Sequence, residues 1–163
     1  MNTPRLSILF VCMGNICRSP TAEGVMRAKL RAAGLDARIE VESAGTHGYH
    51  VGEAPDRRTC QAAQRRGYDL SGLRGRQVAA EDFARFDWIL AADRQNLALL
   101  NAKCPPSYRG KLHLLLEPLP GGQEVPDPYY GGADGFDRVL DLVEAACDAW
   151  LLRVVGDAER AAR

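Results

Sequence analysis

Residues 6–20 read LSILFVCMGNICRSP, and this stretch decides the fold. Its first part, Leu6 to Val11, is a continuous apolar run, which is typical of a strand buried on both faces of a sheet. A short loop follows, and the Ala-, Leu-, Met- and Lys-rich stretch from Pro20 to Ala33 predicts a helix that ends at Gly34. A strand, a loop and a helix in this order form the unit from which parallel sheets are built.

The same alternation continues along the chain. Further strands are predicted over 38–43, 88–92 and 112–116, and further helices over 56–66, 80–85, 93–102 and 135–154. The predicted fold class is α/β: a single-domain, three-layer α/β/α structure over 1–163 with a four-stranded, mostly parallel sheet. A tail after about residue 155 could be flexible. Because such sheets bind ligands beyond the carboxyl ends of their strands, we expect one site to be formed by the loops that begin at Cys12, Ala44, Asp93 and Glu117.

The composition excludes several classes of protein. The 21 Lys and Arg residues balance 21 Asp and Glu residues, whereas nucleic-acid-binding proteins usually carry a basic excess, so no nucleic-acid partner is expected. The run from Ile8 to Val11 is too short for a signal peptide or a membrane span, so membrane insertion is not expected either. The five cysteines are odd in number and scattered, which favours free thiols and a cytoplasmic location, with export by a signal-less route left open. The oligomeric state, a monomer or a weak homodimer, stays open as well.

The loop between the first strand and the first helix has the composition of an anion site. Gly14 and Asn15 tolerate a left-handed backbone, which a tight loop needs if its N–H groups are to point inward. Ser19 can cap the helix and Pro20 suits its first position, so the helix dipole would add positive potential there. Arg18 supplies a planar fork that matches two phosphate oxygens. The residues expected to bind phosphate are Met13, Gly14, Asn15, Ile16, Cys17 and Arg18.

Cys12 stands where the strand ends and this loop begins. Inward-pointing amides, a helix N-terminus and Arg18 all favour a thiolate, so Cys12 is predicted to be a nucleophile that attacks phosphorus. The alternative is a small buried side chain at a strand end, and the coincidence of thiol, turn residues, Arg, cap and Pro in one loop argues against it. The loop lacks the Gly-Lys-Ser/Thr ending of a nucleotide-binding P-loop and the three glycines of a dinucleotide fingerprint, so neither nucleotide family is supported.

Residues 12–20, CMGNICRSP, resemble the signature of the low-molecular-weight protein tyrosine phosphatases. Other landmarks of that family match in the same order and cover nearly the whole chain: Ser43-Ala-Gly-Thr46, Asp69-Leu-Ser71 with Arg76-Gln77, Asp93 with Asn96, and Asp127-Pro-Tyr-Tyr130. The resemblance implies hydrolysis of phosphotyrosine and small aryl phosphates through a phosphocysteine on Cys12, without a metal or a cofactor. Arg18 would bind the phosphate, and Asp127 would act as general acid and then as general base.

The resemblance also implies how the substrate is held. Tyr49, Tyr129 and Tyr130 would form the walls of the cleft and stack on an aryl group, with ordinary surface tyrosines as the alternative. For Asp127 the alternative is an acidic turn residue beside proline. Phosphotyrosine proteins are the expected partners, and a cognate tyrosine kinase is a further candidate.

The resemblance implies that Asn15, Ser19 and Ser43 form a polar network that braces the loop and donates a hydrogen bond to the thiolate, and Asp93 would support the loop as well. Asp93 could pair with Arg18 and also cap the helix that follows it. Cys17, as in the family, could form a reversible disulfide with the nucleophile, or it could pack as a buried thiol under the loop.

One position departs from the family. Many relatives carry His after the Asp-x-Ser-x segment, whereas this chain has Leu73, which cannot hydrogen-bond, so the polar network at the loop is expected to be weaker or rewired. His47 and His50, combined with the loop cysteines, suggest a metal site, but a metal would occupy the nucleophile and none is expected. The remaining cysteines are expected to pack in or beside helices: Cys60, Cys104 and Cys147.

Two other enzymes share this fold and kind of loop. A thiol-dependent arsenate reductase would relay oxidation through further cysteines after the second helix, and residues 78–92 contain none. A protein arginine phosphatase would be expected to carry Thr at the position of Ile16, and an apolar residue there favours phosphotyrosine. A module that binds phosphotyrosine without cleaving it is disfavoured because Cys12, Arg18 and Asp127 are all present.

Overall fold

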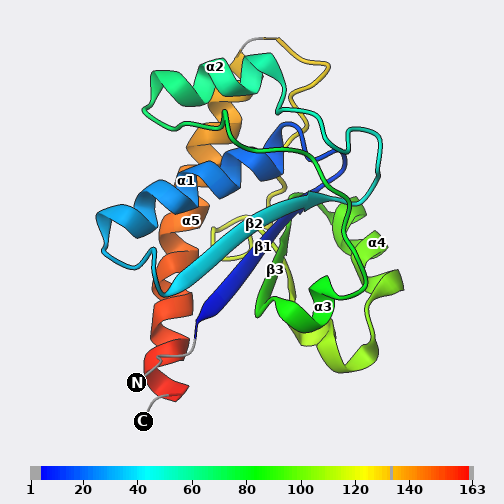
Figure 1. Ribbon diagram of the computed structural model, residues 1–163, viewed down its shortest axis with the longest axis vertical. Helices are drawn as coiled ribbons and strands as arrows, with labels where there is room; N and C mark the ends of the chain where they lie inside the picture. The colour runs from blue at the N-terminus through cyan, green and yellow to red at the C-terminus, as the bar shows by residue number, and fades with distance from the viewer. Residues whose placement is uncertain (1–4, 133, 162–163) are drawn as a thin grey trace.

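The computed structural model describes residues 5–132 and 134–161 and has the predicted α/β architecture (Figure 1). Its sheet has four strands in the order β2-β1-β3-β4, and every pair is parallel. The strands are β1 (Leu6–Cys12), β2 (Ile39–Gly45), β3 (Trp88–Ala91) and β4 (Leu112–Leu114). The predicted domain limits, residues 1 and 163, lie outside the described ranges.

Helices cover both faces of the sheet (Figure 1). One face is covered by α1 (Arg18–Ala32) and α5 (Asp134–Ala161), and α2 (Arg57–Arg65) packs against α5. The other face is covered by α3 (Asp82–Arg85), α4 (Arg94–Lys103) and the 3-10 helix η1 (Pro106–Lys111). The three layers are therefore those that the alternation of strands and helices predicts.

Strand β1 lies in the middle of the sheet, and this position explains its apolar composition. Ile8 and Phe10 point into the core formed with α1 and α5, whereas Leu9 and Val11 point into the core formed with α3 and α4. All four side chains are fully buried. A strand covered on both faces requires apolar residues at every position rather than at alternate ones.

Several element limits differ from the expectation; β2, for example, ends at Gly45 instead of residue 43. The final helix was predicted over 135–154 but continues through Gly156 to Ala161. Val154, the last residue of the predicted range, is buried, and residues 155–161 form further turns of the helix instead of a flexible tail. Strand β4 ends two residues early, since the chain turns and the N–H of Glu117 donates to the carbonyl of Leu114 at 3.0 Å. Helix α3 is a single turn over four residues instead of the predicted 80–85.

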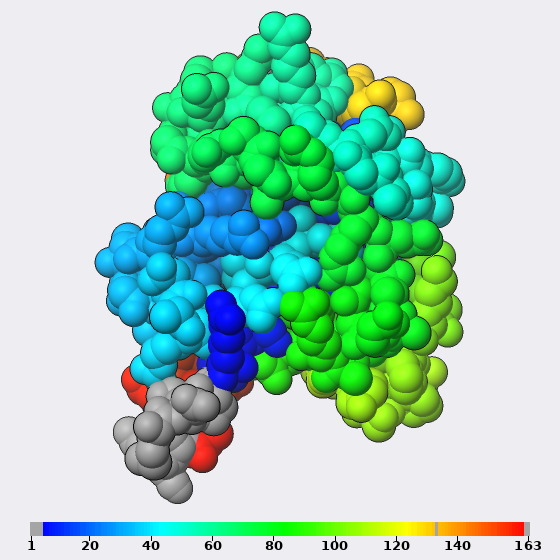
Figure 2. All heavy atoms as spheres, in the orientation of Figure 1, coloured from blue at the N-terminus to red at the C-terminus, as the bar shows by residue number. Residues whose placement is uncertain are grey.

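Strand β2 forms one edge of the sheet. In the space-filling view its residues lie at the bottom of a hollow between α1 and the segment of residues 72–76 (Figure 2). The same segment reaches the end of β2, where Gly45 pairs with Gln77 in an isolated bridge. No helix within residues 5–132 and 134–161 is both long enough and apolar enough to cross a membrane.

Candidate active site

The loop between β1 and α1 is shaped by one left-handed residue. Asn15 has a φ of 59°, as its residue type allows, whereas Gly14 lies outside the left-handed region, contrary to the expectation. Gly14 instead keeps the loop clear of His50, because a Cβ there would stand 3.0 Å from Cδ2 of that partly exposed ring and the ring would have to shift. The predicted turn residues are therefore used, one for its conformation and one for its small size.

The carbonyls and the N–H groups of this loop differ in their hydrogen bonding. The carbonyls of Cys12, Met13 and Ile16 accept hydrogen bonds from the backbone of neighbouring loops, at 2.8, 3.0 and 2.8 Å. The N–H groups of residues 13–17 donate to no protein acceptor within the described part of the chain. Buried N–H groups are nearly always paired, so five successive free donors form a place where an anion would be held.

Helix α1 begins earlier than expected. Its first residue is Arg18 and its N-cap position is Cys17, which makes no side-chain capping bond. The expectation that Ser19 caps the helix is therefore wrong, and Pro20 occupies the third helical position. The Ser19 hydroxyl is used elsewhere, because its Oγ lies 3.0 Å from Sγ of Cys12.

A buried hydrogen-bond chain leads away from the thiol. The side-chain amide of Asn15 donates to Oγ of Ser19 at 2.8 Å and to Oγ of Ser43 at 3.0 Å. Ser43 in turn donates to the carboxylate of Glu23 at 2.6 Å. Ser19 accepts from Asn15, and its own proton has two acceptors within reach, the Cys12 sulfur at 3.0 Å and the carbonyl of Ala44 at 3.4 Å. The predicted supporting residues Ser19 and Ser43 thus lie in one connected network behind the loop.

One end of this network lies at Arg76, three residues after Leu73. The side-chain oxygen of Asn15 accepts from the backbone N–H of Arg76 at 3.0 Å. Arg76 is itself fixed by ion pairs with Asp82 and Glu42, at 2.9 and 3.3 Å. The amide oxygen of Asn15 therefore has a partner without a histidine.

Arg18 connects the loop to the other strands. Its Nη1 donates to Asp93 at 2.7 Å and to the carbonyl of Val125 at 3.0 Å, and its Nη2 lies 3.8 Å from the Asp127 carboxylate. Burial works to lower the pKa of this guanidinium, but the negative charges of Cys12, Asp93 and Asp127 outweigh burial and raise it. Arg18 is therefore a permanent buried cation at the bottom of the site.

Asp93 has both of the contacts that the sequence predicts. One carboxylate oxygen accepts from Arg18, and the other accepts the backbone N–H of Asn96 at 2.8 Å, which caps α4. The start of α4 and the orientation of the guanidinium are thus fixed by a single side chain.

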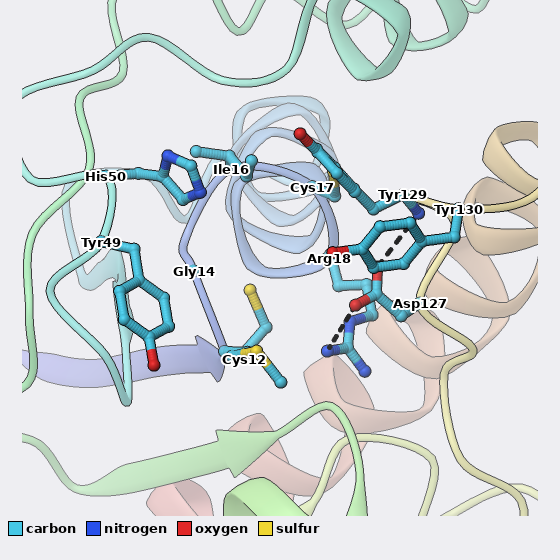
Figure 3. Close-up of a pocket in the computed structure, with 11 residues that line it drawn as sticks. Cys12, Gly14, Ile16, Cys17, Arg18, Tyr49, His50, Asp127, Tyr129 and Tyr130 are labelled. Atoms are coloured by element: carbon cyan, nitrogen blue, oxygen red, sulfur yellow. Dashed lines mark hydrogen bonds and ion pairs between the residues drawn. The ribbon is translucent and has the colours of Figure 1, made fainter.

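A cavity of about 200 Å³ opens above the loop, and Figure 3 shows its lining. Tyr49 and His50, from the loop after β2, lie on one side, and Asp127, Tyr129 and Tyr130, from the loop after β4, lie on the other. Tyr130 is 91% exposed, Tyr49 68% and Tyr129 40%, so aromatic surface rises around the opening. The floor is made by residues 12–14 and 16–18.

The predicted site residues are thus brought together. The side chain of Asn15 does not line the cavity and is 2% exposed, so only its backbone N–H, one of the five free donors of the loop, is available to an anion. Its left-handed backbone turns the side chain toward Ser19 and Ser43 behind the loop. Asn15 therefore supports the loop.

Cys17 lines the cavity as a free thiol. Burial raises the pKa of the Cys17 thiol to about 12, although the hydroxyl of Thr59 works in the opposite direction. At neutral pH Cys17 is therefore a neutral thiol. The other three cysteines are also free; Cys104 and Cys147 are buried and Cys60 is half-buried.

The two histidines of the loop after β2 do not meet the cysteines. His47 contacts Thr46 and stacks on Tyr49 at 5.0 Å, and Nδ1 of His50 lies 2.9 Å from Glu53. Within residues 5–132 and 134–161, no group of three or more His, Cys, Asp or Glu side chains could hold a metal ion.

Glu23 was not expected at the site, although a carboxylate four residues after Ser19 lies on the same face of the predicted helix. Burial raises the pKa of Glu23 above its ordinary value, against the hydrogen bond from Ser43 and the charge of Arg27. His50 was considered only as a metal ligand, but it lines the cavity. Arg76 belongs to a family landmark, but its contribution here is a backbone N–H, which the residue type does not reveal.

Comparisons with known proteins agree with this geometry. A family model described as low molecular weight phosphotyrosine protein phosphatase matches residues 7–160. A putative low molecular weight protein-tyrosine-phosphatase of Synechocystis is 50% identical over 145 residues, which cover 87% of this chain and 92% of that protein. The human low molecular weight phosphotyrosine protein phosphatase is 40% identical, over 89% of this chain and 93% of its own.

Solved structures are similar over nearly the whole chain. A protein tyrosine phosphatase from Entamoeba histolytica, with Hepes in its active site, superposes with a TM-score of 0.90 at 39% identity, over 93% of this chain and 98% of that chain. YfkJ from Bacillus subtilis gives a TM-score of 0.90 at 33% identity, over 96% of this chain and 99% of that chain.

Proposed function

The chain belongs to the low molecular weight phosphotyrosine protein phosphatase family, and we propose that it hydrolyses phosphotyrosine in proteins through a covalent intermediate on Cys12. Named members of this family are phosphoric monoester hydrolases. The observation that carries the mechanism is the set of unpaired N–H groups at residues 13–17, placed between the Cys12 thiol and the Arg18 guanidinium. A dianionic phosphate fits such a site because donors and positive charge surround it.

Substrate binding places the phosphorus above the sulfur. The loop N–H groups and Nη2 of Arg18 hold the three non-bridging oxygens, while Nη1 of Arg18 stays on Asp93 and Val125. The tyrosine ring then lies between Tyr49 on one side and Tyr129 with Tyr130 on the other. The apolar side chain of Ile16, at the cavity floor, favours an aryl group over a guanidinium.

The first chemical step transfers the phosphoryl group to the protein. The Cys12 thiolate attacks phosphorus, so that a P–S bond forms and the P–O bond to the tyrosine breaks. Asp127, at the open side of the cavity, gives its proton to the departing phenolate oxygen. Ser19 stabilises the sulfur by donating its hydroxyl proton to it.

The second step regenerates the thiolate. Asp127, now ionised, accepts a proton from water, and the resulting nucleophile attacks phosphorus as the P–S bond breaks. Inorganic phosphate leaves, and the Asp127 proton is restored for the next cycle. No redox step or metal enters this balance.

The nucleophile can be tested directly. We expect hydrolysis of p-nitrophenyl phosphate to be unchanged by a chelator and to be lost by at least about 10⁴-fold in Cys12→Ser, because an alkoxide is far harder to form than a thiolate. Cys60→Ser is the matched control, since Cys60 is half-buried on α2 and lies outside the cavity. Full activity in Cys12→Ser would overturn the mechanism.

The substrate class needs a separate test. Phosphotyrosine and phosphoarginine peptides of the same sequence should be compared by kcat/KM, with arsenate reduction in the presence of a thiol as a third measurement. We expect the phosphotyrosine peptide to be preferred by about 100-fold or more, because the cavity walls are aromatic. A preference for phosphoarginine would overturn the argument from Ile16.

A further inference from the structure

The proposed acid, Asp127, has few contacts of its own. Its side chain is 40% exposed and lies 3.8 Å from Arg18. Among the residues that the structure describes, it has one hydrogen bond, and this bond is local: Oδ1 accepts the backbone N–H of Tyr129 at 3.0 Å. The direction in which the carboxyl points therefore depends on where the backbone of Tyr129 is held.

Tyr129 is held from outside its own loop by Arg58. The Arg58 guanidinium lies over the Tyr129 ring, 5.3 Å from its centroid, and over the Phe136 ring at 4.8 Å. Tyr129 belongs to the loop of residues 126–132 and Phe136 to the first turn of α5. One cation from α2 thus clamps the loop against the start of the helix that follows it.

Arg58 is itself anchored to the phosphate loop. Its Nε and Nη2 donate to the two carboxylate oxygens of Asp56 at 3.2 and 3.0 Å. Asp56 also caps α2 through the N–H of Arg58, and its own N–H donates to the carbonyl of Ile16 at 2.8 Å. A continuous chain of contacts therefore runs from Ile16 through Asp56 and Arg58 to Tyr129.

From this chain of contacts we infer that Arg58 is a positioning residue for Asp127, which holds the acid at a fixed distance from the nucleophile loop. The inference rests on the proposed function, because it concerns the proton that Asp127 delivers. Arg58 does not line the cavity, so it acts through its contacts with Tyr129, Phe136 and Asp56. Its side chain is 46% exposed, so its replacement leaves no hole in the core.

The leaving group provides a selective readout. A basic phenolate needs a proton as the P–O bond breaks, whereas a dinitrophenolate leaves without one. A misplaced Asp127 should therefore slow phenyl phosphate and spare 2,4-dinitrophenyl phosphate. A general weakening of the site would slow both.

The test compares kcat/KM for these two substrates in Arg58→Met and Arg58→Lys. We expect Arg58→Met to lose about tenfold on phenyl phosphate and less than about twofold on the dinitrophenyl ester. Arg58→Lys should recover part of the loss, because an ammonium can still lie over the two rings. Arg57→Met is the matched control, since Arg57 is the exposed neighbour on the same helix turn.

Two further measurements separate the possible failures. In an Asp127→Asn background, Arg58→Met should add no further loss on phenyl phosphate, because both changes remove the same proton transfer. Amide hydrogen exchange at Tyr129, measured without substrate, should be faster in Arg58→Met than in the wild type.

Equal losses on both esters, no loss on either, or unchanged exchange at Tyr129 would each overturn the role of Arg58. If the wild-type protein hydrolysed neither ester, the proposed function would fail, and the exchange measurement would still decide whether Arg58 holds the loop.

Discussion

The phosphate loop and the loop of residues 126–132 face each other across one cavity but are fixed in different ways. The side chains behind the phosphate loop are buried and hydrogen-bonded: Asn15 is 2% exposed and makes three such bonds. The loop of residues 126–132 carries exposed side chains, and Tyr130 is 91% exposed. Arg58 and a local hydrogen bond between Asp127 and Tyr129 hold this loop in place. The difference suggests that the site combines a preorganised anion cradle with an acid whose position depends on a few surface contacts.

The largest effect is expected at the centre of the rigid side. Arg18→Lys keeps a positive charge but loses the planar fork that contacts Asp93 and Val125 while facing the phosphate. We expect kcat/KM for p-nitrophenyl phosphate to fall about 10³-fold and inhibition by inorganic phosphate to weaken. Arg153→Lys on α5, where Arg153 pairs with Glu117, is a matched control that should change neither. A loss below tenfold would show that charge alone suffices.

The next effect is expected on the exposed side. Asp127→Asn removes the transferable proton with little change in shape, and kcat/KM for phenyl phosphate should fall about 10²-fold. Folding stability should change by less than about 0.5 kcal/mol, because the carboxyl is 40% exposed and has one local hydrogen bond. Steady-state kinetics and urea denaturation measure the two quantities. A large loss of stability would contradict the contrast between the loops.

A smaller effect on rate, with a large effect on stability, is expected at Asn15. Asn15→Ala removes the bonds to Ser19 and Ser43, which keep Cys12 and Glu23 as partners, and leaves the N–H of Arg76 without its acceptor, so stability should fall by roughly 3 kcal/mol and kcat/KM about tenfold. Asn15→Gly removes the same bonds but adopts φ of 59° without strain, so it should be about 1 kcal/mol more stable than Asn15→Ala. Chemical denaturation of both variants checks this order, and equal stabilities would mean that the left-handed turn carries no strain.

The smallest effects concern two carboxylates that should respond to pH in opposite directions. Burial raises the pKa of Glu23, so the stability that its protonated form gives is lost as pH rises from about 4.5 through the higher folded value. Burial also opposes ionisation of Asp56, but hydrogen bonds from Arg58 outweigh it and lower the pKa. The stability from ionised Asp56 is therefore present above about 3.8 and lost as pH falls through the lower folded value.

Urea denaturation of Glu23→Gln and Asp56→Asn at several pH values tests this difference. Relative to each variant, the wild type should lose stability with rising pH in the first case and with falling pH in the second. Parallel pH dependences in the two variants would contradict the opposite signs.

Local patterns predicted much of the fold and of the site. The apolar run before Cys12 predicted a central strand, Asn15 predicted a left-handed turn, and Asp93 predicted both of its contacts, because each depends on the residue type or on a nearby helix start. The prediction that Ser19 caps α1 was wrong, because the Ser19 hydroxyl contacts the Cys12 sulfur and accepts a hydrogen bond from Asn15 instead.

The features that the sequence did not predict depend on distant partners. Arg58 and Tyr129 are far apart in the chain and meet only after α2 and α5 pack together. The final helix was predicted too short, whereas it continues through Gly156 beyond the buried Val154. Packing of this kind overrides local preference and leaves no local pattern.

The contacts of Arg18 also bear on the order in which the protein is made. Its partners Asp93 and Val125 lie 75 and 107 residues further along the chain. During synthesis, Cys12 and Arg18 leave the ribosome long before either partner exists, and long-range pairing of parallel strands is slow to form. The nascent chain therefore carries its thiol beside an Arg18 that cannot make both of these contacts until residue 125 has been synthesised.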